Sequence, residues 1–486
     1  MNRNSETGTS APPPVPANEI SRQAENPALM RDVDRFVREN EDAIVRDIAR
    51  LVSIPSVEGP ATPDAPYGAE PKRALLCALK IAEELGLQTV NCDNRMGYAV
   101  VGEDRGQGYL ATITHVDVVP AGDGWPADPF TLREQDGWLL GRGVLDDKGP
   151  SVLCLYALKY LKEAGIPLRY PVRALLGSNE ESHMHDLEYY QEHYPDPLFC
   201  ISPDAEFPLI CGEKGIYHAK LVSRHVPVNV LEISGGVAAN AVPAKATARV
   251  RSKGLKSAGA VTAAELEPGI WALESAGVSG HASVPQGTVN AIGLLVDYLL
   301  ANSIPDESER PYFETISRLL RVTDGSLLGL QSSDDFFTPL TAVGGKISTD
   351  SEGHISQTVD SRYGLTMSGE RITELLREAA GISAEVFPVN DSVPFCMNPE
   401  TPAVRACIDS YNLVTGEDAH PFTIGGGTYA RHFPNAVAFG PEHPERPAPD
   451  FCGPIHGINE AAKKADFMEA LRIYILALLR LEELDY

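Results

Sequence analysis

The sequence predicts an α/β fold with a mixed, largely parallel sheet flanked by helices and interrupted by an inserted α+β domain. Two observations predict it. Up to about residue 221, apolar strand-like runs alternate with amphipathic helices, which is typical of a parallel sheet with helical crossovers. Beyond residue 222 the runs take the period of two of an antiparallel sheet, and the earlier alternation returns at about residue 395. The main layer is therefore expected to be discontinuous in sequence.

A chain of 486 residues is long enough for two domains. We expect a polar, Pro-rich tail that is disordered, two parts of a main domain, and an insertion between those parts. The expected limits are 1–28 for the tail, 29–221 and 395–486 for the main domain, and 222–394 for the insertion.

The first part is expected to begin with two helices. Apolar residues at helical spacing predict one helix between Leu29 and Leu51, and a second over 72–86 that stops at Gly86. The elements expected after them are strands at 98–103 and 109–119, taken as neighbours, a helix at 151–165, a buried strand at 171–178, a helix at 186–194 and a strand at 198–202.

The insertion and the last part follow the same rules. The insertion is expected to hold strands at 215–225, 230–236, 245–254, 355–367 and 384–391, and helices at 291–302, 312–325 and 370–381. The last part is expected to hold a helix at 403–416, a Gly-rich turn at 424–430, a strand at 435–440 and a final helix.

The composition argues against several classes of function. A net charge of −26, with no run of Lys or Arg, leaves no basic face for nucleic acid. No stretch approaches the length of apolar residues that a membrane span needs, and the N-terminal segment lacks the apolar core of a signal peptide. The eight cysteines are scattered without a C-x-x-C pair. We therefore expect a soluble cytoplasmic protein with reduced thiols, and neither nucleic acid nor membrane as a partner.

Carboxylates and histidines recur at the ends of strand-like runs, each beside a Gly-, Pro- or Ser-rich turn. Open α/β sheets bind ligands at the carboxyl ends of their strands. Imidazole mixed with carboxylate suits divalent ions such as Zn²⁺ or Mn²⁺. The residues concerned are His115, Asp117, Asp146, Asp147, Glu180, Glu181, Asp204 and His456.

Each motif could serve such a metal site, or it could have an ordinary structural role instead. In H-x-D, His115 can bind metal while Asp117 on the same strand face accepts the other ring N–H. Asp146 can bridge two cations, or its Asp-Asp pair can cap the following helix. In the Glu-Glu pair, one carboxylate can bind metal while the other takes a proton from the metal-bound water, or both can belong to a charged loop.

Asp204 and His456 are weak signals by themselves. Taken together, however, five separate segments each supply one ligand type from a predicted strand end. Five ligands beside a free carboxylate indicate a two-metal hydrolase site.

The chain resembles the M20 family of metallopeptidases over about residues 30–486. It is most similar to the dipeptidase branch, which includes PepV-like and Xaa-His (carnosinase-like) dipeptidases. The resemblance is carried by HVDVVPAGDGW, GRGVLDDKGP, GSNEES, SPDAEFPLICGEKG, GHASVPQGTVNA and GGGTYAR. SPDAEFP-x-x-x-GEKG and GGGTYAR are the most specific of these segments.

The resemblance implies how the site is assembled. One metal ion would be held by His115 and Asp204 and the other by Glu181 and His456, with Asp146 as the bridge. The peptide bond after the bridging residue is often cis in the family. Glu180 would be the general base and acid.

The insertion would then be a lid. By resemblance, His281 would stabilise the tetrahedral oxyanion with Asn240 beside it, and Arg362 would bind the free carboxylate of the substrate. The backbone N–H groups expected around that anion are those of Gly425, Gly426 and Gly427. Without the resemblance, Arg362 could equally be a surface residue of a strand, and the three glycines could simply form a tight turn.

The expected activity is that of a cytoplasmic dipeptidase with two divalent ions, Zn²⁺ or Mn²⁺. A metal-bridging water and a Glu general base would cleave dipeptides that have a free C-terminal carboxylate. The enzyme would be a monomer or a homodimer. One alternative is an N-acyl-amino-acid deacylase of the acetylornithine or succinyl-diaminopimelate type on the same scaffold. The other is a non-catalytic metal-binding protein.

Overall fold

The structure, a computed structural model, describes residues 26–486, so the expected tail falls almost wholly outside the described residues. The chain forms two compact units. The first comprises the residues up to Cys211 with Met397–Phe422 and Thr428–Tyr486, and the second comprises Gly212–Cys396 with Thr423–Gly427. The Gly-rich turn thus belongs to the second unit, whereas the sequence limits put it in the main layer. The domain limits given above stay a prediction.

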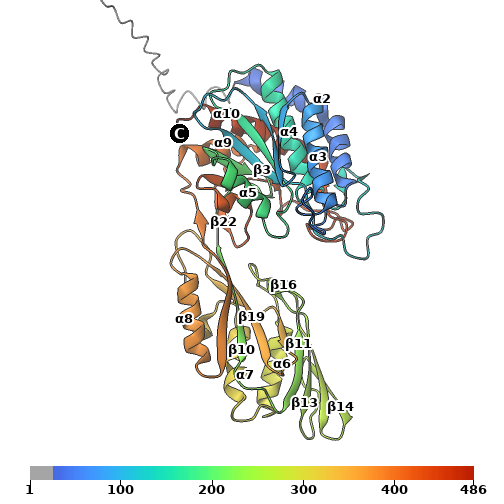
Figure 1. The fold of residues 1–486 in the computed structure, drawn as a ribbon, viewed down its shortest axis with the longest axis vertical. Helices are drawn as coiled ribbons and strands as arrows, with labels where there is room; N and C mark the ends of the chain where they lie inside the picture. The colour runs from blue at the N-terminus through green and yellow to red at the C-terminus, as the bar shows by residue number, and fades with distance from the viewer. Residues whose placement is uncertain (1–25) are drawn as a thin grey trace, which may run out of the picture. The chain divides into compact units, whose positions relative to one another are not determined.

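The first unit contains a mixed sheet (Figure 1). Its parallel strands are, in order, β6 (Val172–Gly177), β3 (Leu110–His115), β7 (Phe199–Ser202) and β23 (Ala436–Ala438). Beyond β6 the antiparallel strands β2 (Met96–Val101) and β1 (Gln88–Cys92) complete this side of the sheet. The predicted fold class, α/β with a mixed sheet flanked by helices, is confirmed, and the four central strands are the parallel ones.

One predicted neighbour relation is wrong. The strand expected at 98–103 does not lie beside the strand expected at 109–119, because β6 separates β2 from β3. The physical reason is the crossover: α4 (Lys148–Glu163) links β3 to the parallel strand β6 and brings the two together. β2 then pairs with the other edge of β6.

Helices flank this sheet (Figure 1). They are α2 (Pro27–Val52), α3 (Ala69–Glu84), α4, α5 (His185–His193), α9 (Pro402–Thr415) and α10 (Lys464–Glu482). The short strands are β4 (Arg133–Gln135), β5 (Trp138–Leu140) and β25 (Ala461–Lys463) in one small sheet, and β8 (Ala205–Glu206) paired with β24 (Pro441–Glu442). The chain passes between the units in β9 (Ile210–Glu213), β21 (Phe395–Cys396) and β22 (Phe422–Ile424).

Helix α4 is the central helix of the first unit. Almost every residue from Lys148 to Leu161 is buried, and the helix contacts both β3 and α10. It begins at Lys148, three residues before the expected start, because Pro150 in the first turn needs no intrahelical N–H bond. The Asp146–Asp147 pair therefore lies directly at its N-terminus.

The second unit contains an antiparallel sheet with helices. In order, its strands are β14 (Val261–Glu267), β15 (Ile270–Ala276), β13 (Lys245–Arg251), β11 (Val230–Gly235), β18 (Ile347–Thr349), β19 (Ile355–Tyr363), β10 (Gly215–Ser223) and β20 (Ala384–Ser392), with β17 (Thr341–Val343) also on β19. Its helices are α6 (Ala291–Ala301), α7 (Arg310–Arg321) and α8 (Gly369–Ala380), and a small ladder pairs β12 (Ala241–Val242) with β16 (Gly280–His281).

The sequence prediction omitted the β14–β15 hairpin. Its first strand is largely exposed and carries two glutamates, so it lacks the apolar alternation that marks a strand. Among the described helices, none is both long and apolar enough to cross a bilayer.

Gly149 permits the close approach of α4 to α10. A methyl group at this position would lie 2.6 Å from two ring carbons of Phe467 and would also meet the carbonyl oxygen of Val144. We expect Gly149→Ala to lower the free energy of unfolding by about 1–3 kcal/mol, because overpacking shifts the backbone. Urea unfolding followed by circular dichroism measures this. Gly59→Ala, whose nearest contact would be 3.8 Å, is the control, and equal stability of the two variants would contradict the packing argument.

Candidate metal centre

The five side chains predicted to bind metal lie together in the first unit. Each comes from a different segment: the end of β3, the turn before α4, the turn after β6, the turn between β7 and β8, and the turn before β25. In that order they are His115, Asp146, Glu181, Asp204 and His456. Their donor atoms form two groups, and within each group all donor atoms lie within 4.8 Å of one another.

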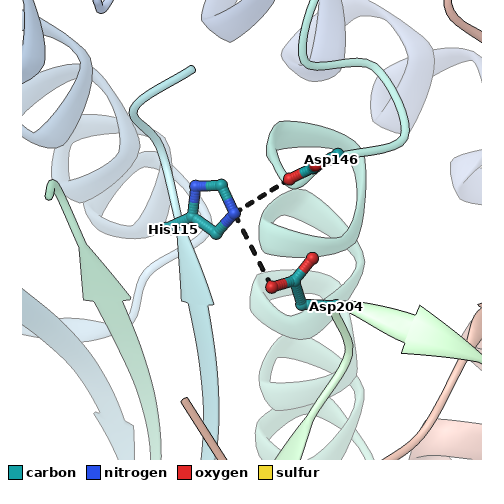
Figure 2. A group of neighbouring side chains, drawn as sticks. All are labelled: His115, Asp146 and Asp204. Atoms are coloured by element: carbon teal, nitrogen blue, oxygen red, sulfur yellow. Dashed lines mark ion pairs between the residues drawn. The ribbon is translucent and has the colours of Figure 1, made fainter. Parts of the chain in front are cut away.

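The first group joins His115, Asp146 and Asp204, as Figure 2 shows. His115 Nε2 lies 3.0 Å from Asp146 Oδ1 and 3.8 Å from Asp204 Oδ2. The imidazole is fully buried, and its Nε2 has no hydrogen bond of good geometry within the described part of the chain. A buried nitrogen aimed at two carboxylates without such a bond is typical of a metal ligand.

The second group joins Asp146, Glu181 and His456. His456 Nε2 lies 2.9 Å from Asp146 Oδ2 and 3.0 Å from Glu181 Oε2. Asp146 therefore directs Oδ1 to the first group and Oδ2 to the second. This is the arrangement that a carboxylate bridging two cations requires. The Asp146–Asp147 peptide bond is cis, as the family resemblance implies.

Burial and like charge dominate the electrostatics of the group. They raise the pKa of Asp204 well above its ordinary value, and that of Glu181 as well. Burial also acts to raise the pKa of Asp146, but the close imidazoles of His115 and His456 hold it below the ordinary range. The same contact with Asp146, together with Glu181, raises the pKa of His456 to about 10. The cluster therefore favours positive charge, whether a proton or a cation supplies it.

Glu180 precedes the candidate ligand Glu181 in sequence, and its own carboxylate belongs to neither ligand group. Among the described residues, that carboxylate takes no hydrogen bond or ion pair. Burial raises its pKa well above the ordinary value, and the nearby carboxylates of Asp204 and Glu181 add to the effect. A free carboxylate with a raised pKa is suited to accept and return a proton near neutral pH.

β3 ends at His115, so Asp117 lies just beyond the strand. The two side chains of H-x-D are therefore not placed on one face by a strand, as was expected. His115 Nδ1 lies 3.1 Å from the Asp117 carbonyl oxygen and 3.4 Å from its Oδ1. The carboxylate also accepts two backbone N–H groups, with 3.2 Å from Glu180 N to Oδ1 and 3.1 Å from Glu181 N to Oδ2. Asp117 thus connects the His115 segment to the Glu-Glu turn.

Three other buried carboxylates hold the turns, and of these sequence reasoning noted Asp147 but missed Asp186 and Glu460. Asp147 Oδ2 accepts the backbone N–H of His115 at 3.1 Å. Asp186 accepts N–H bonds from the two residues before Glu180 and a hydroxyl bond of 2.6 Å from Tyr429. Glu460 accepts backbone N–H bonds in the turn that carries Asp146. Only the proximity of these acidic residues to a ligand in the sequence could have indicated them.

The residues predicted for the lid lie near one another within the second unit. Arg362 Nη1 donates to the Gly425 carbonyl oxygen at 3.1 Å, and a methyl group on Gly425 would lie 2.7 Å from Ser283 Cβ. Ser283 Oγ lies 2.7 Å from His281 Nδ1. Asn240 immediately precedes Ala241, the residue paired with His281, and its carbonyl oxygen accepts the Ala282 N–H at 2.9 Å.

Arg362 is already well bonded inside this unit. It is buried, and its Nε and Nη2 donate to the two carboxylate oxygens of Asp360 at 2.8 and 2.9 Å. Arg362 is therefore a buried residue of β19. The roles predicted for His281, Asn240, Arg362 and the three glycines stay predictions.

Known proteins share both the sequence and the fold. The model of "Peptidase family M20/M25/M40" matches residues 111–480. "Putative dipeptidase YtjP" of Bacillus subtilis is 31% identical over 465 residues, which cover 92% of this chain and 98% of that protein.

Two solved structures show the same fold. Human carnosine dipeptidase 1 has a TM-score of 0.57 and 16% identity, over 94% of this chain and 100% of that chain. The Bacillus subtilis YXEP protein, described as a dinuclear metal binding peptidase from the M20 family, has a TM-score of 0.52 and 10% identity, over 91% and 98%. The family resemblance is confirmed: the chain belongs to peptidase family M20/M25/M40 and is a dipeptidase-like metallopeptidase.

Proposed function

We propose that this protein hydrolyses dipeptides with a free C-terminal carboxylate, with two divalent ions, Zn²⁺ or Mn²⁺, and with Glu180 as general base. One observation supports it above all. Asp146 directs one oxygen to each of two three-residue ligand groups, and the carboxylate of Glu180 is spare. Small peptides as partners, a cytoplasmic location and a monomeric or homodimeric state belong to the same proposal.

The residues present fit a pair of divalent ions. Each group offers one imidazole nitrogen and carboxylate oxygens, a donor set that suits Zn²⁺ or Mn²⁺, and neither group includes a thiol. The orphaned, buried Nε2 of His115 supports the fit. His115 and Asp204 would hold one ion, and Glu181 and His456 the other, with Asp146 shared. When bound, such ions make a water molecule more acidic and polarise the scissile carbonyl.

Glu180 would move the proton of the reaction. Its carboxylate would accept a proton from the attacking water and deliver it to the departing amine. The raised pKa of Glu180 favours both transfers near neutral pH. Asp117, which accepts the backbone N–H groups of Glu180 and its neighbour, would keep the carboxylate in place.

The second unit would recognise the substrate. In Arg362, Asp360 occupies Nε and one N–H of Nη2, and the Gly425 carbonyl occupies one N–H of Nη1. Only the second N–H of Nη1 and of Nη2 would therefore serve a substrate carboxylate. The backbone N–H groups of Gly425, Gly426 and Gly427 would surround the same anion. His281, with Nδ1 held by Ser283, would offer Nε2 to the oxyanion, with Asn240 as a second polar group.

A substrate panel tests the choice between dipeptidase and deacylase. Alanyl-alanine, alanyl-alanine amide, β-alanyl-histidine and N-acetyl-alanine are each incubated with protein reconstituted with Zn²⁺ or Mn²⁺. The proposal expects hydrolysis of alanyl-alanine and much slower hydrolysis of its amide, which lacks the carboxylate. The β-alanyl peptide measures tolerance for a longer N-terminal residue. Hydrolysis of N-acetyl-alanine alone would establish the deacylase, and inertness of the metal-loaded protein toward every substrate would favour a non-catalytic role.

Replacing Glu180 tests the base. Glu180→Gln is expected to lower kcat by about 10²–10⁴-fold, because the amide cannot accept the proton. Metal content, measured by elemental analysis, is expected to stay at the wild-type value because Glu180 belongs to neither ligand group. Glu188→Gln, which alters an exposed carboxylate on α5, is the matched control with wild-type kcat. Wild-type kcat in the Glu180 variant would remove the base assignment.

Metal binding is expected to release protons. In the metal-free protein the pKa of His456 is raised to about 10 by Asp146 and Glu181, and burial raises the pKa of Asp204. Because ligands bind in their deprotonated forms, loading at about pH 7 should release at least about one proton, and metal affinity should rise with pH up to about 10.

Calorimetric titration in two buffers with different heats of ionisation counts the protons released. In His456→Ala the count is expected to fall by about one. Equal heats in the two buffers would show that the site is already deprotonated and would contradict the electrostatic argument.

A further inference from the structure

A buried ion pair lies between the turns that carry the ligands of the second group. Arg142 and Glu460 are 1% and 0% exposed, and Arg142 Nη1 lies 2.7 Å from Glu460 Oε2. Arg142 belongs to the turn before α4, and Glu460 follows the turn that carries His456. The two residues are 318 positions apart in sequence. Neither is a metal ligand in the arrangement described above.

Glu460 binds the backbone of the Asp146 turn. Its Oε1 accepts the N–H groups of Leu145 at 2.9 Å and Asp146 at 3.1 Å. Its Oε2 accepts the N–H of Gly143 at 2.9 Å in addition to the arginine. One carboxylate thus satisfies four donors. A charged acceptor forms stronger hydrogen bonds than a neutral one, so the turn has little freedom to move away.

The guanidinium of Arg142 contacts the turn that carries His456. Its Nη2 donates to the carbonyl oxygen of Gly457, the residue after His456, at 3.2 Å. Its guanidinium also lies 5.5 Å from the ring centroid of Trp125. The His456 side chain is half-exposed, and its backbone has a positive φ of 60°. Since few side-chain contacts hold this ring, its position depends on how firmly the turn is held.

We propose that Arg142 and Glu460 are positioning residues that set the distance between Asp146 and His456 and so create the second metal group. The inference rests on the metal assignment in the proposed function. The first group shares Asp146 but depends less on this pair, because its other two members, His115 at the end of β3 and Asp204 between β7 and β8, lie on other segments. Loss of the pair's geometry therefore weakens one metal site selectively.

Arg142→Lys is the sharpest variant. Lysine keeps the charge and can pair with Glu460, but its single ammonium group lacks the planar fork that also reaches Gly457. Metal-free protein is dialysed against increasing Zn²⁺ or Mn²⁺, and bound metal is measured by elemental analysis. We expect one ion to bind with wild-type affinity and the second to bind about 10–100-fold more weakly. Circular dichroism and melting of the metal-free variant verify the fold.

Two further variants complete the test. Arg472→Lys makes the same change in an ion pair with Asp34, 2.7 Å long, between α10 and α2, and should bind both ions like the wild type. Glu460→Gln keeps the shape of the side chain, but its NH₂ group faces two donors. It should weaken the same ion, and it supplies the test if Arg142→Lys does not fold.

The outcomes separate this inference from the proposed function. Wild-type binding of both ions by folded Arg142→Lys and Glu460→Gln would overturn the positioning role, and so would equal weakening of both ions. Binding of fewer than two ions by the wild type would instead overturn the proposed function. Weaker binding of the second ion alone would support both the positioning role and the proposed function.

Discussion

Repulsion among buried carboxylates is the constraint on which the rest of the site depends. Asp146, Glu181 and Asp204 lie close together with Glu180 beside them, and burial acts to raise the pKa of each. Only in Asp146 do the neighbouring imidazoles of His115 and His456 reverse that rise. Such a cluster is unfavourable unless protons or cations neutralise it. The fold must therefore hold these groups together against their own repulsion, and it does so through the backbone of the turns.

A second set of acidic residues supplies this support. Asp117 accepts the N–H groups of Glu180 and its neighbour, and Asp147 accepts that of His115. Asp186 holds the start of the Glu-Glu turn, and Glu460 holds the turn before α4. Most of these bonds are to main-chain N–H groups. A lysine or arginine directed at the ligands would compete with the metal ions, whereas a backbone N–H group fixes a turn without adding a charge.

The sequence indicated the candidate ligands more readily than the residues that hold their turns. His115, Asp146 and Glu181 follow apolar strand-like runs, and the carboxyl-end rule for parallel sheets is enough to bring such residues together. Glu460 could not be found in this way, because its function comes from hydrogen bonds to residues 314 to 317 positions away. A long-range hydrogen bond leaves no periodic signal in one chain.

The difference between local sequence patterns and long-range contacts also explains the errors in the predicted fold. Periodicity identified β2, β3, β6, β7 and β23 in the first unit but missed β1. It also could not give the strand order, since β2 and β6 pair through a ladder that no local pattern records. The start of α4 was missed because Pro150 suggested a boundary, although the first turn of a helix tolerates proline. The β14–β15 hairpin was missed because its exposed strand has glutamates where the rule expects apolar residues.

The metal groups alone do not decide between a dipeptidase and a deacylase, because either reaction needs an activated water and a general base. Discrimination must come from groups that recognise the far end of the substrate, and in the second unit Arg362 is the main candidate. Burial acts to raise the pKa of Asp360, but His218 and Arg362 hold it below its ordinary value, so the aspartate remains charged beside the arginine.

That aspartate fixes the plane of the guanidinium while leaving other N–H groups for a ligand. A rigid, partly neutralised arginine discriminates by geometry more than by charge. In the proposed function, such an arginine would favour a dipeptide, whose carboxylate lies at one set distance from the scissile bond, over longer peptides whose carboxylate lies farther away.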